Sequence, residues 1–177
     1  DHDRNVRVIV LSGSVGNFSA GFDLKESSYA KTDQPLEHYT WMIRNMRTTY
    51  LSVWNSRKPT IAKITGYCIA GGCYLQMLCD ISIAADDAVL GHPAVVTGGV
   101  SAMPLWNWYL GARKAKEMLL TGKLIDGTEA ARIGLVNAAV PRDRLDAEVA
   151  SWVEQIVSVP PDASVLCKEA INTAADV

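Results

Sequence analysis

The chain has 177 residues, of which 49% are hydrophobic and 20% are charged, and its formal net charge is −2 at pH 7. This size and composition are typical of one globular domain with enough apolar side chains for a core. A charge near zero gives no basis for binding nucleic acid or an anionic membrane, and no apolar run approaches the roughly 20 residues that a membrane-spanning helix needs.

The predicted elements alternate between strands and helices along the chain. Short apolar runs predict strands over residues 6–11, 60–64, 81–85, 89–90 and 135–140. Apolar residues at helical spacing predict helices over residues 36–55, 74–79, 104–120, 128–133, 145–158 and 163–175. Thr128 is the expected N-cap of its helix, and Gly134 the expected end. Such alternation is typical of an α/β fold with a parallel sheet covered by helices.

The most informative stretch is the glycine pair Gly71-Gly72. It comes shortly after the predicted strand 60–64 and leads directly into an apolar helical run. Glycines at such a junction let a ligand approach the backbone closely, and the first N–H groups of a helix have no partner within it. This arrangement suits stabilisation of negative charge that develops on a carbonyl oxygen. An isolated glycine pair is equally compatible with a tight turn that has no chemical role.

A second segment of small residues, Phe18-Ser19-Ala20-Gly21-Phe22-Asp23, follows the first predicted strand. Here too a strand exit leaves the backbone open to a ligand. One backbone N–H from each of two such loops is what a two-donor oxyanion hole requires. The two segments together therefore indicate a site that polarises a carbonyl group.

Sequence motifs of several other classes of site are missing. The first strand is not followed by G-x-G-x-x-G, which argues against dinucleotide binding, and there is no P-loop lysine motif. Ser14 lacks the glycine two positions earlier that a nucleophile elbow needs. The spacing of Cys68, Cys73 and Cys79 matches no common zinc pattern. We therefore expect no metal, and interpret the cysteines as packing residues in a reducing compartment, with the cytoplasm as the default location.

The two loop segments resemble the motifs of the enoyl-CoA hydratase/isomerase (crotonase) family. That family shows F-x-A-G-x-D-(L/I)-K-E after a strand, as residues 18–26 do here, and later K-P-x-I-A followed by G-G-(G/C), as at residues 58–62 and 71–73. The resemblance covers nearly the whole chain. It implies a crotonase fold, a spiral of ββα units with sheets covered by helices. It also implies a core over residues 1–142 and a helical segment over residues 143–177 that begins the oligomerisation or lid region.

The resemblance assigns roles to residues of both loops. Phe22 and Gly71 would each donate one backbone N–H to an oxyanion hole that holds a thioester carbonyl as it becomes an enolate. The backbone of Ala20 and Leu24 would contact the adenine of coenzyme A. Lys25 would help with phosphate charge, although an exposed loop lysine is equally an ordinary surface residue. No tightly bound cofactor is expected, because coenzyme A would arrive as part of the thioester substrate.

The family pattern breaks at the two glutamates that hydratases use to add water to a double bond. This chain has Tyr74 at the first position and Ala94, after Gly91-His92-Pro93, at the second. An alanine transfers no proton, and a phenol with a pKa of about 10 is a poor base at neutral pH but donates hydrogen bonds. Tyr74 and His92 are the candidates to replace the missing acids; the alternative for both is a structural role.

Two classes of function therefore stay open. The first is an acyl-CoA enzyme: a hydratase or isomerase, the family's commonest outcome, or a decarboxylase or thioester hydrolase, for which the missing acids leave room. The second is a catalytically silent homologue that binds acyl-CoA or serves as an assembly subunit. The resemblance further implies a homotrimer or hexamer. Because family members extend beyond both ends of this sequence, we also expect terminal parts of the natural protein to be missing.

Overall fold

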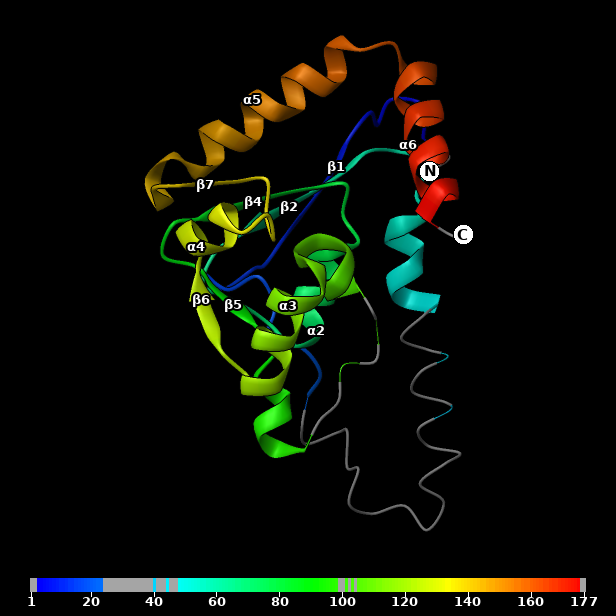
Figure 1. Ribbon diagram of the computed structural model, residues 1–177. Coiled ribbons are helices and arrows are strands. Elements are labelled where there is room, and N and C mark those ends of the chain that lie inside the picture. Colours follow the sequence, from blue (N-terminus) through cyan, green and yellow to red (C-terminus); the bar gives the residue numbers. More distant parts are fainter. Residues whose placement is uncertain are drawn as a thin grey trace.

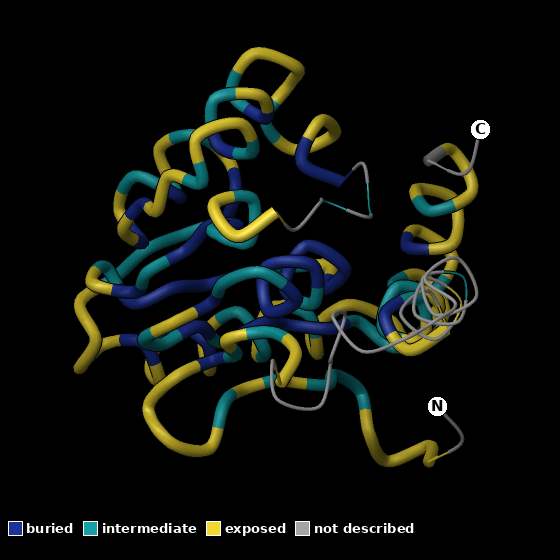
Figure 2. The backbone as a smooth tube through the Cα atoms, turned by 90° about the horizontal axis from the view of Figure 1, so that it is seen from below, coloured by how far each residue is buried: buried dark blue, intermediate teal, exposed yellow. Residues whose placement is uncertain are grey.

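The structure is a computed structural model that describes residues 3–23, 40, 44, 48–98, 101, 103 and 105–175. Within these residues the strands form two sheets, one of four strands and one of three. Helices lie on both sides of the larger sheet (Figure 1). Buried segments gather in the middle of the molecule, and the outer turns of the surrounding helices are exposed (Figure 2).

The four-stranded sheet is parallel throughout, in the order β1-β2-β4-β7. The register places Ile61 opposite Ile81 and Ile83 opposite Ala138. The two central strands are almost completely buried, because helices cover both faces of a parallel sheet. The strands are β1 (Ile9–Ser12), β2 (Thr60–Ile64), β4 (Ile81–Ala85) and β7 (Ala138–Val140).

The smaller sheet has the order β3-β5-β6. β3 (Tyr67–Ile69) and β5 (Val89–Gly91) are parallel, whereas β6 (Leu124–Asp126) is antiparallel to β5. On the other side of β3, Ser19 forms a parallel bridge with Cys68. Ser19 N donates to Tyr67 O at 2.9 Å, and Ile69 N donates to Ser19 O at 3.0 Å. Three parallel segments therefore leave this sheet in the same direction.

The helices surround the larger sheet in two layers. α5 lies over one face of this sheet, and α2 and α3 lie on the other side of it (Figure 1). Within the described part of the chain, none of the helices combines the length and apolar character needed to cross a bilayer. The helical elements are α2 (Gly71–Met77), η1 (Pro93–Thr97), α3 (Leu105–Thr121), α4 (Gly127–Arg132), η2 (Arg142–Arg144), α5 (Leu145–Ser158) and α6 (Pro161–Ala175).

An ion pair and hydrogen bonds connect α6 to the rest of the protein. The Nζ atom of Lys168 lies 2.8 Å from Asp80 Oδ2, which also accepts hydrogen bonds from Thr60 N at 2.7 Å and Thr60 Oγ1 at 2.9 Å. Asn172 Nδ2 donates to Trp54 O at 3.0 Å, so α6 runs beside the helical residues 48–54 (Figure 1). A lysine head group at this depth is stable only because it is paired and hydrogen-bonded.

Several predicted elements agree with the structure residue for residue, namely those at 60–64, 81–85 and 145–158. The helix predicted to contain residues 74–79 begins at the glycine pair, as expected, with Gly71 as its first residue, but it ends at Met77. The predicted strand 6–11 begins only at Ile9. β3 and β6 were not predicted, since three residues carry too little periodicity. Half of the predicted helix 36–55 lies outside the described residues, and residues 48–54 of it are helical. The division at residue 142 stays a prediction.

The predicted N-cap at Thr128 is wrong. α4 begins at Gly127, and the side chain of Asp126 accepts a hydrogen bond from Glu129 N at 2.7 Å. Asp126 is also the last residue of β6, so pairing with β5 brings its carboxylate to the start of the helix. Asp and Thr both cap helices well, and here the pairing of β6 with β5 places Asp126 rather than Thr128 at the N-cap position.

Candidate functional site

The candidate site lies where the three parallel segments of the smaller sheet end. Phe22 follows the segment that contains Ser19, Gly71 follows β3, and His92 follows β5. Because the carboxyl ends of parallel strands meet at one edge, residues far apart in the sequence become neighbours there. This topology brings four of the predicted site residues together, since Tyr74 lies in the first turn of α2, the helix that Gly71 begins.

The backbones of the two glycine loops are in direct contact. A Cβ atom added to Gly21 would lie 2.9 Å from Gly71 N, and one added to Gly71 would lie 3.3 Å from Gly21 Cα. Gly21 has a φ of 92°, which L side chains rarely adopt. Ala70, directly before Gly71, has a φ of 50°, the one positive φ outside glycine among the described residues. Such an unfavourable backbone conformation persists only where the surrounding structure holds it in place, and it is typical of functional sites.

The N–H groups of Phe22 and Gly71 donate to no acceptor among the described residues. Their chain neighbours do have partners. Gly21 N donates to Ser19 Oγ at 3.2 Å, and Ala70 N donates to Gly91 O at 2.9 Å. The Gly71 N–H is unfilled because it belongs to the first turn of α2, where no earlier carbonyl of the helix can accept it. Within the described structure, two adjacent loops thus each present one backbone N–H that has no acceptor.

A continuous row of rings runs from the first glycine loop into the protein, in the order Phe22, Tyr50, Tyr74, His92 and Trp106. Successive ring centroids are 6.4, 6.2, 5.4 and 6.5 Å apart. Three of these residues were predicted from the sequence as site residues, and Tyr50 joins the first of them to the other two. The described residues of this row include no carboxylate, and the acids or bases that the row itself offers are phenols and the imidazole.

The hydroxyl group of Tyr74 acts as a hydrogen-bond donor in this structure. It lies 2.7 Å from Ser101 Oγ, and Ser101 Oγ donates to Met103 O at 3.2 Å. Because a serine hydroxyl has one proton, the proton between the two hydroxyl groups belongs to Tyr74. Tyr74 is 2% exposed and His92 is 4% exposed, so both side chains are screened from bulk water. Sequence reasoning missed Ser101, which sits in a segment searched only for carboxylates.

Tyr50 is the other residue that sequence reasoning missed. Burial raises the pKa of its hydroxyl group to about 12, and the neighbouring Tyr74 adds to this rise. The hydroxyl is therefore protonated at neutral pH and available as a donor. No sequence signal marks Tyr50, because the segment that contains it reads only as an amphipathic helix.

The coenzyme A contacts predicted from the resemblance are only partly within the described structure. Ala20 is exposed and lies in the first glycine loop, beside Gly21. Leu24 and Lys25 lie outside the described residues. The roles of all three stay predictions.

The thiol groups near the site are buried rather than poised for reaction. Cys73 Sγ donates to Cys68 O at 2.9 Å, and burial raises the pKa of the Cys68 thiol well above its ordinary value. Among the described residues there is no group of three His, Cys, Asp or Glu side chains that could hold a metal ion.

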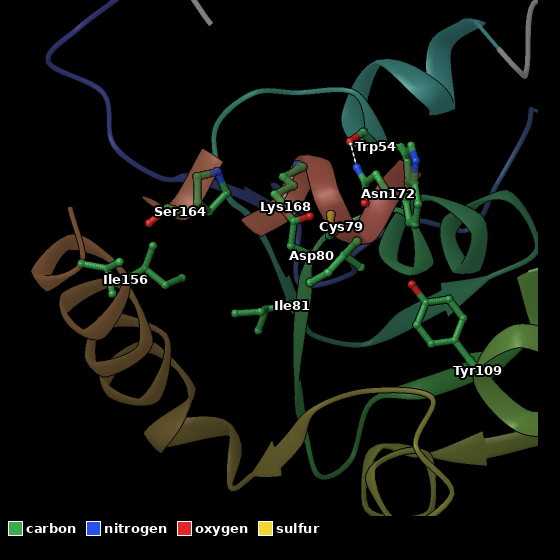
Figure 3. A pocket seen from close by; sticks show the side chains of 12 residues that line it. Trp54, Cys79, Asp80, Ile81, Tyr109, Ile156, Ser164, Lys168 and Asn172 are labelled. Atoms are coloured by element: carbon green, nitrogen blue, oxygen red, sulfur yellow. Dashed lines mark hydrogen bonds and ion pairs between the residues drawn. The ribbon is translucent and has the colours of Figure 1, made fainter. Parts of the chain in front are cut away.

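A separate hollow of about 330 Å³ lies at the opposite end of α2 (Figure 3). Its walls include Cys79 and Asp80, which follow this helix, together with Lys168 of α6 and Tyr109 of α3. Tyr109 donates to Met77 O, and burial raises the pKa of its hydroxyl to about 12. None of the predicted site residues lines this hollow, so it is distinct from the row of rings.

The chain is similar to known proteins over its whole length. The model of the enoyl-CoA hydratase/isomerase family matches residues 1–177. A probable enoyl-CoA hydratase of Rhizobium meliloti is 36% identical, and the match covers 100% of this chain and 68% of that protein. A probable enoyl-CoA hydratase of Mycobacterium bovis is 34% identical, with 98% and 66% covered.

Two solved structures are similar over almost the whole chain. An enoyl-CoA hydratase/isomerase from Xanthobacter autotrophicus Py2 has a TM-score of 0.92 at 34% identity, covering 99% of this chain and 65% of that one. An enoyl-CoA hydratase from Bacillus anthracis has a TM-score of 0.89 at 33% identity, with 99% and 68% covered. The chain thus spans about two thirds of the length of the proteins it matches.

Proposed function

The chain belongs to the enoyl-CoA hydratase/isomerase family and has the predicted crotonase fold, and from this premise we propose that it converts acyl-CoA thioesters by stabilising an enolate. The observation that supports the proposal is that the N–H groups of Phe22 and Gly71, in loops whose backbones touch, have no acceptor among the described residues. A thioester oxygen that accepts from both would hold the negative charge that develops as the α-carbon reacts.

The proposed oxyanion hole depends on backbone geometry alone. Loss of one donor of this kind typically lowers the rate by about 10²–10³-fold. The contact between Gly21 and Gly71 keeps the two loops together, and the absence of side chains at both positions leaves the amides open. Both features support a hole that is formed before the substrate arrives.

In our proposal, Tyr74 and His92 transfer protons to and from the substrate. Tyr74 already donates to Ser101, and rotation of its hydroxyl toward a bound acyl group would let it donate to the substrate instead. The imidazole of His92 lies against the Tyr74 ring, with centroids 5.4 Å apart, and is another group of the row that can exchange a proton. Hydration or isomerisation of an enoyl thioester would use this pair in place of two carboxylates.

Decarboxylation of a 2-carboxyacyl thioester is a second candidate, favoured by the absence of a carboxylate from the described row of rings. Loss of CO₂ breaks the bond between the α-carbon and the carboxyl group, and the electron pair enters the thioester as an enolate. The α-carbon then takes a proton from Tyr74 or His92. This reaction requires enolate stabilisation and a proton donor but no strong base.

The test uses purified protein with crotonyl-CoA and, separately, with malonyl-CoA. Loss of enoyl-thioester absorbance would indicate water addition, release of CO₂ would indicate decarboxylation, and both would be followed at several pH values. Tyr74→Phe and His92→Ala are each expected to lower turnover by about 10²-fold. Tyr109→Phe, which removes a hydroxyl near the separate hollow, is the matched control and should leave turnover unchanged.

The outcomes separate the candidate functions. Protection of the protein against heat by both thioesters, without any turnover, would favour the acyl-CoA-binding homologue without catalysis. Failure of both thioesters to bind would contradict the proposal. Turnover that survives both site substitutions would exclude Tyr74 and His92 as the essential proton donors.

A further inference from the structure

Tyr50 occupies a position between the two glycine loops that family motifs do not assign. Its ring makes edge contacts with Phe22 on one side, at an interplanar angle of 78°, and with Tyr74 on the other, at 74°. The residue is 8% exposed. The two rings fix its direction, so its hydroxyl has little freedom to turn elsewhere.

The hydroxyl oxygen of Tyr50 lies against the backbone of Gly71. A Cβ atom added to Gly71 would lie only 2.6 Å from this oxygen. No hydrogen-bond partner for the hydroxyl is found among the described residues, although buried tyrosines usually have one. The N–H of the same Gly71 also has no acceptor in the described part of the chain.

The Tyr50 hydroxyl is a donor rather than an acceptor or a base. Burial raises its pKa to about 12, so its proton is retained at neutral pH. Both donors lack an acceptor among the described residues, and one ligand oxygen at the mouth of the glycine loops could accept from both. An oxygen that becomes negatively charged during the reaction would gain most from an additional donor.

We propose that Tyr50 donates a third hydrogen bond to the thioester oxygen of the substrate, alongside the backbone N–H groups of Phe22 and Gly71. This inference rests on the proposed function, because it needs a thioester at that place. It adds a side-chain donor to a hole otherwise made from the main chain. Tyr50 would therefore strengthen polarisation of the carbonyl without contributing a proton to the reaction.

The test compares Tyr50→Phe with Tyr109→Phe, two substitutions that each remove one buried phenol oxygen. The probe is a 4-dimethylaminocinnamoyl-CoA thioester, whose absorption moves to longer wavelength as its carbonyl is polarised. Wild-type protein is expected to shift the band, and Tyr50→Phe to bind the probe with a smaller shift. Turnover of the active thioester should fall about 10- to 100-fold in Tyr50→Phe, as for loss of a hydrogen bond to a charged group.

Without ligand, the melting temperature should respond to these two substitutions in the opposite way to the probe shift and the turnover. Tyr109 donates to Met77 O, so Tyr109→Phe should lower the melting temperature while leaving the probe shift and turnover unchanged. Tyr50→Phe should leave the melting temperature unchanged, because the lost hydroxyl has no partner in the described chain. A merely structural tyrosine would not separate the two measurements in this way.

Three results would overturn the inference. Equal shift and turnover in wild type and Tyr50→Phe would show that the hydroxyl does not touch the thioester oxygen. A drop in melting temperature of Tyr50→Phe as large as that of Tyr109→Phe would show that the hydroxyl has a partner within the chain. Absence of any probe binding to the wild type would refute the proposed function itself, and the third donor with it.

Discussion

Replacement of Gly71 by alanine tests the contact between the two glycine loops directly. The new methyl group would lie 2.6 Å from the Tyr50 hydroxyl oxygen and 3.3 Å from Gly21 Cα. The first of these is a clash, since non-bonded carbon and oxygen atoms pack at about 3.5 Å or slightly less. Tyr50 cannot turn away easily, because the rings of Phe22 and Tyr74 pack against it on both sides.

The expected loss of activity follows from the displacement that the methyl group forces. A shift of the Gly71 amide by about 1 Å costs on the order of 10²-fold in rate, and complete loss of one oxyanion donor costs up to about 10³-fold. Overpacking of a close contact costs about 1–3 kcal/mol in stability. Gly71→Ala should therefore lower kcat/KM for the active thioester by at least about 10²-fold and also lower the melting temperature.

A control and a partial reversal sharpen the experiment. Gly16→Ala places a methyl group where no atom lies within 4 Å, at a φ of 73°, so it has a backbone cost but should leave kcat/KM unchanged. Adding Tyr50→Phe to Gly71→Ala removes the 2.6 Å contact and should restore part of the lost stability. Wild-type kcat/KM in Gly71→Ala would refute the reasoning, because the site would then tolerate separation of the loops.

Three further predictions concern stability. Asp80→Ala leaves the Lys168 charge buried without its partner and should lower the free energy of unfolding in urea by about 3 kcal/mol. Lys168→Met should lower it less, because in that variant Asp80 keeps its hydrogen bonds from Thr60. Asp126→Ala removes the N-cap of α4 and should cost about 1 kcal/mol in thermal denaturation; an unchanged stability would contradict the assigned cap. Burial raises the pKa of both Tyr50 and Tyr109 from 10.0 to about 12, so the folded state keeps these protons up to a higher pH than the unfolded state does. The free energy of unfolding should therefore fall between pH 10 and pH 12, less steeply when both are phenylalanine.

The central elements of the fold could be predicted because their local pattern and their burial agree. β2 and β4 are short, continuous apolar runs that are buried on both faces, so their ends are visible in the sequence. β3 was not visible, because its three residues are too few to show a periodic pattern within a glycine-rich stretch. The cap of α4 depends on where β6 ends, which is set by pairing with β5 and not by neighbouring residues.

The candidate site likewise has residues that the sequence predicts and one that it does not. Gly21 and Gly71 were recognisable because a close approach of two backbones excludes side chains, and that exclusion leaves a mark in the sequence. Tyr50 left no such mark. It stands 21 positions before Gly71, on a helical segment whose pattern records only that one face is apolar. Its place beside Gly71 arises from tertiary packing, which a single sequence does not reveal.

The main-chain origin of the proposed donors has a consequence for mutagenesis surveys. Exchange of the Phe22 side chain for almost any other leaves its amide in place, so an alanine scan of this position would report only the loss of the ring contact with Tyr50 and not the backbone donor. Sensitivity would fall instead on Gly21, where any β-carbon meets the Gly71 nitrogen at 2.9 Å. Proline, which lacks the N–H, is the single substitution that would delete the donor at position 22 directly. A ranking of positions by tolerance would thus single out Gly21, one residue before the proposed donor, the N–H of Phe22.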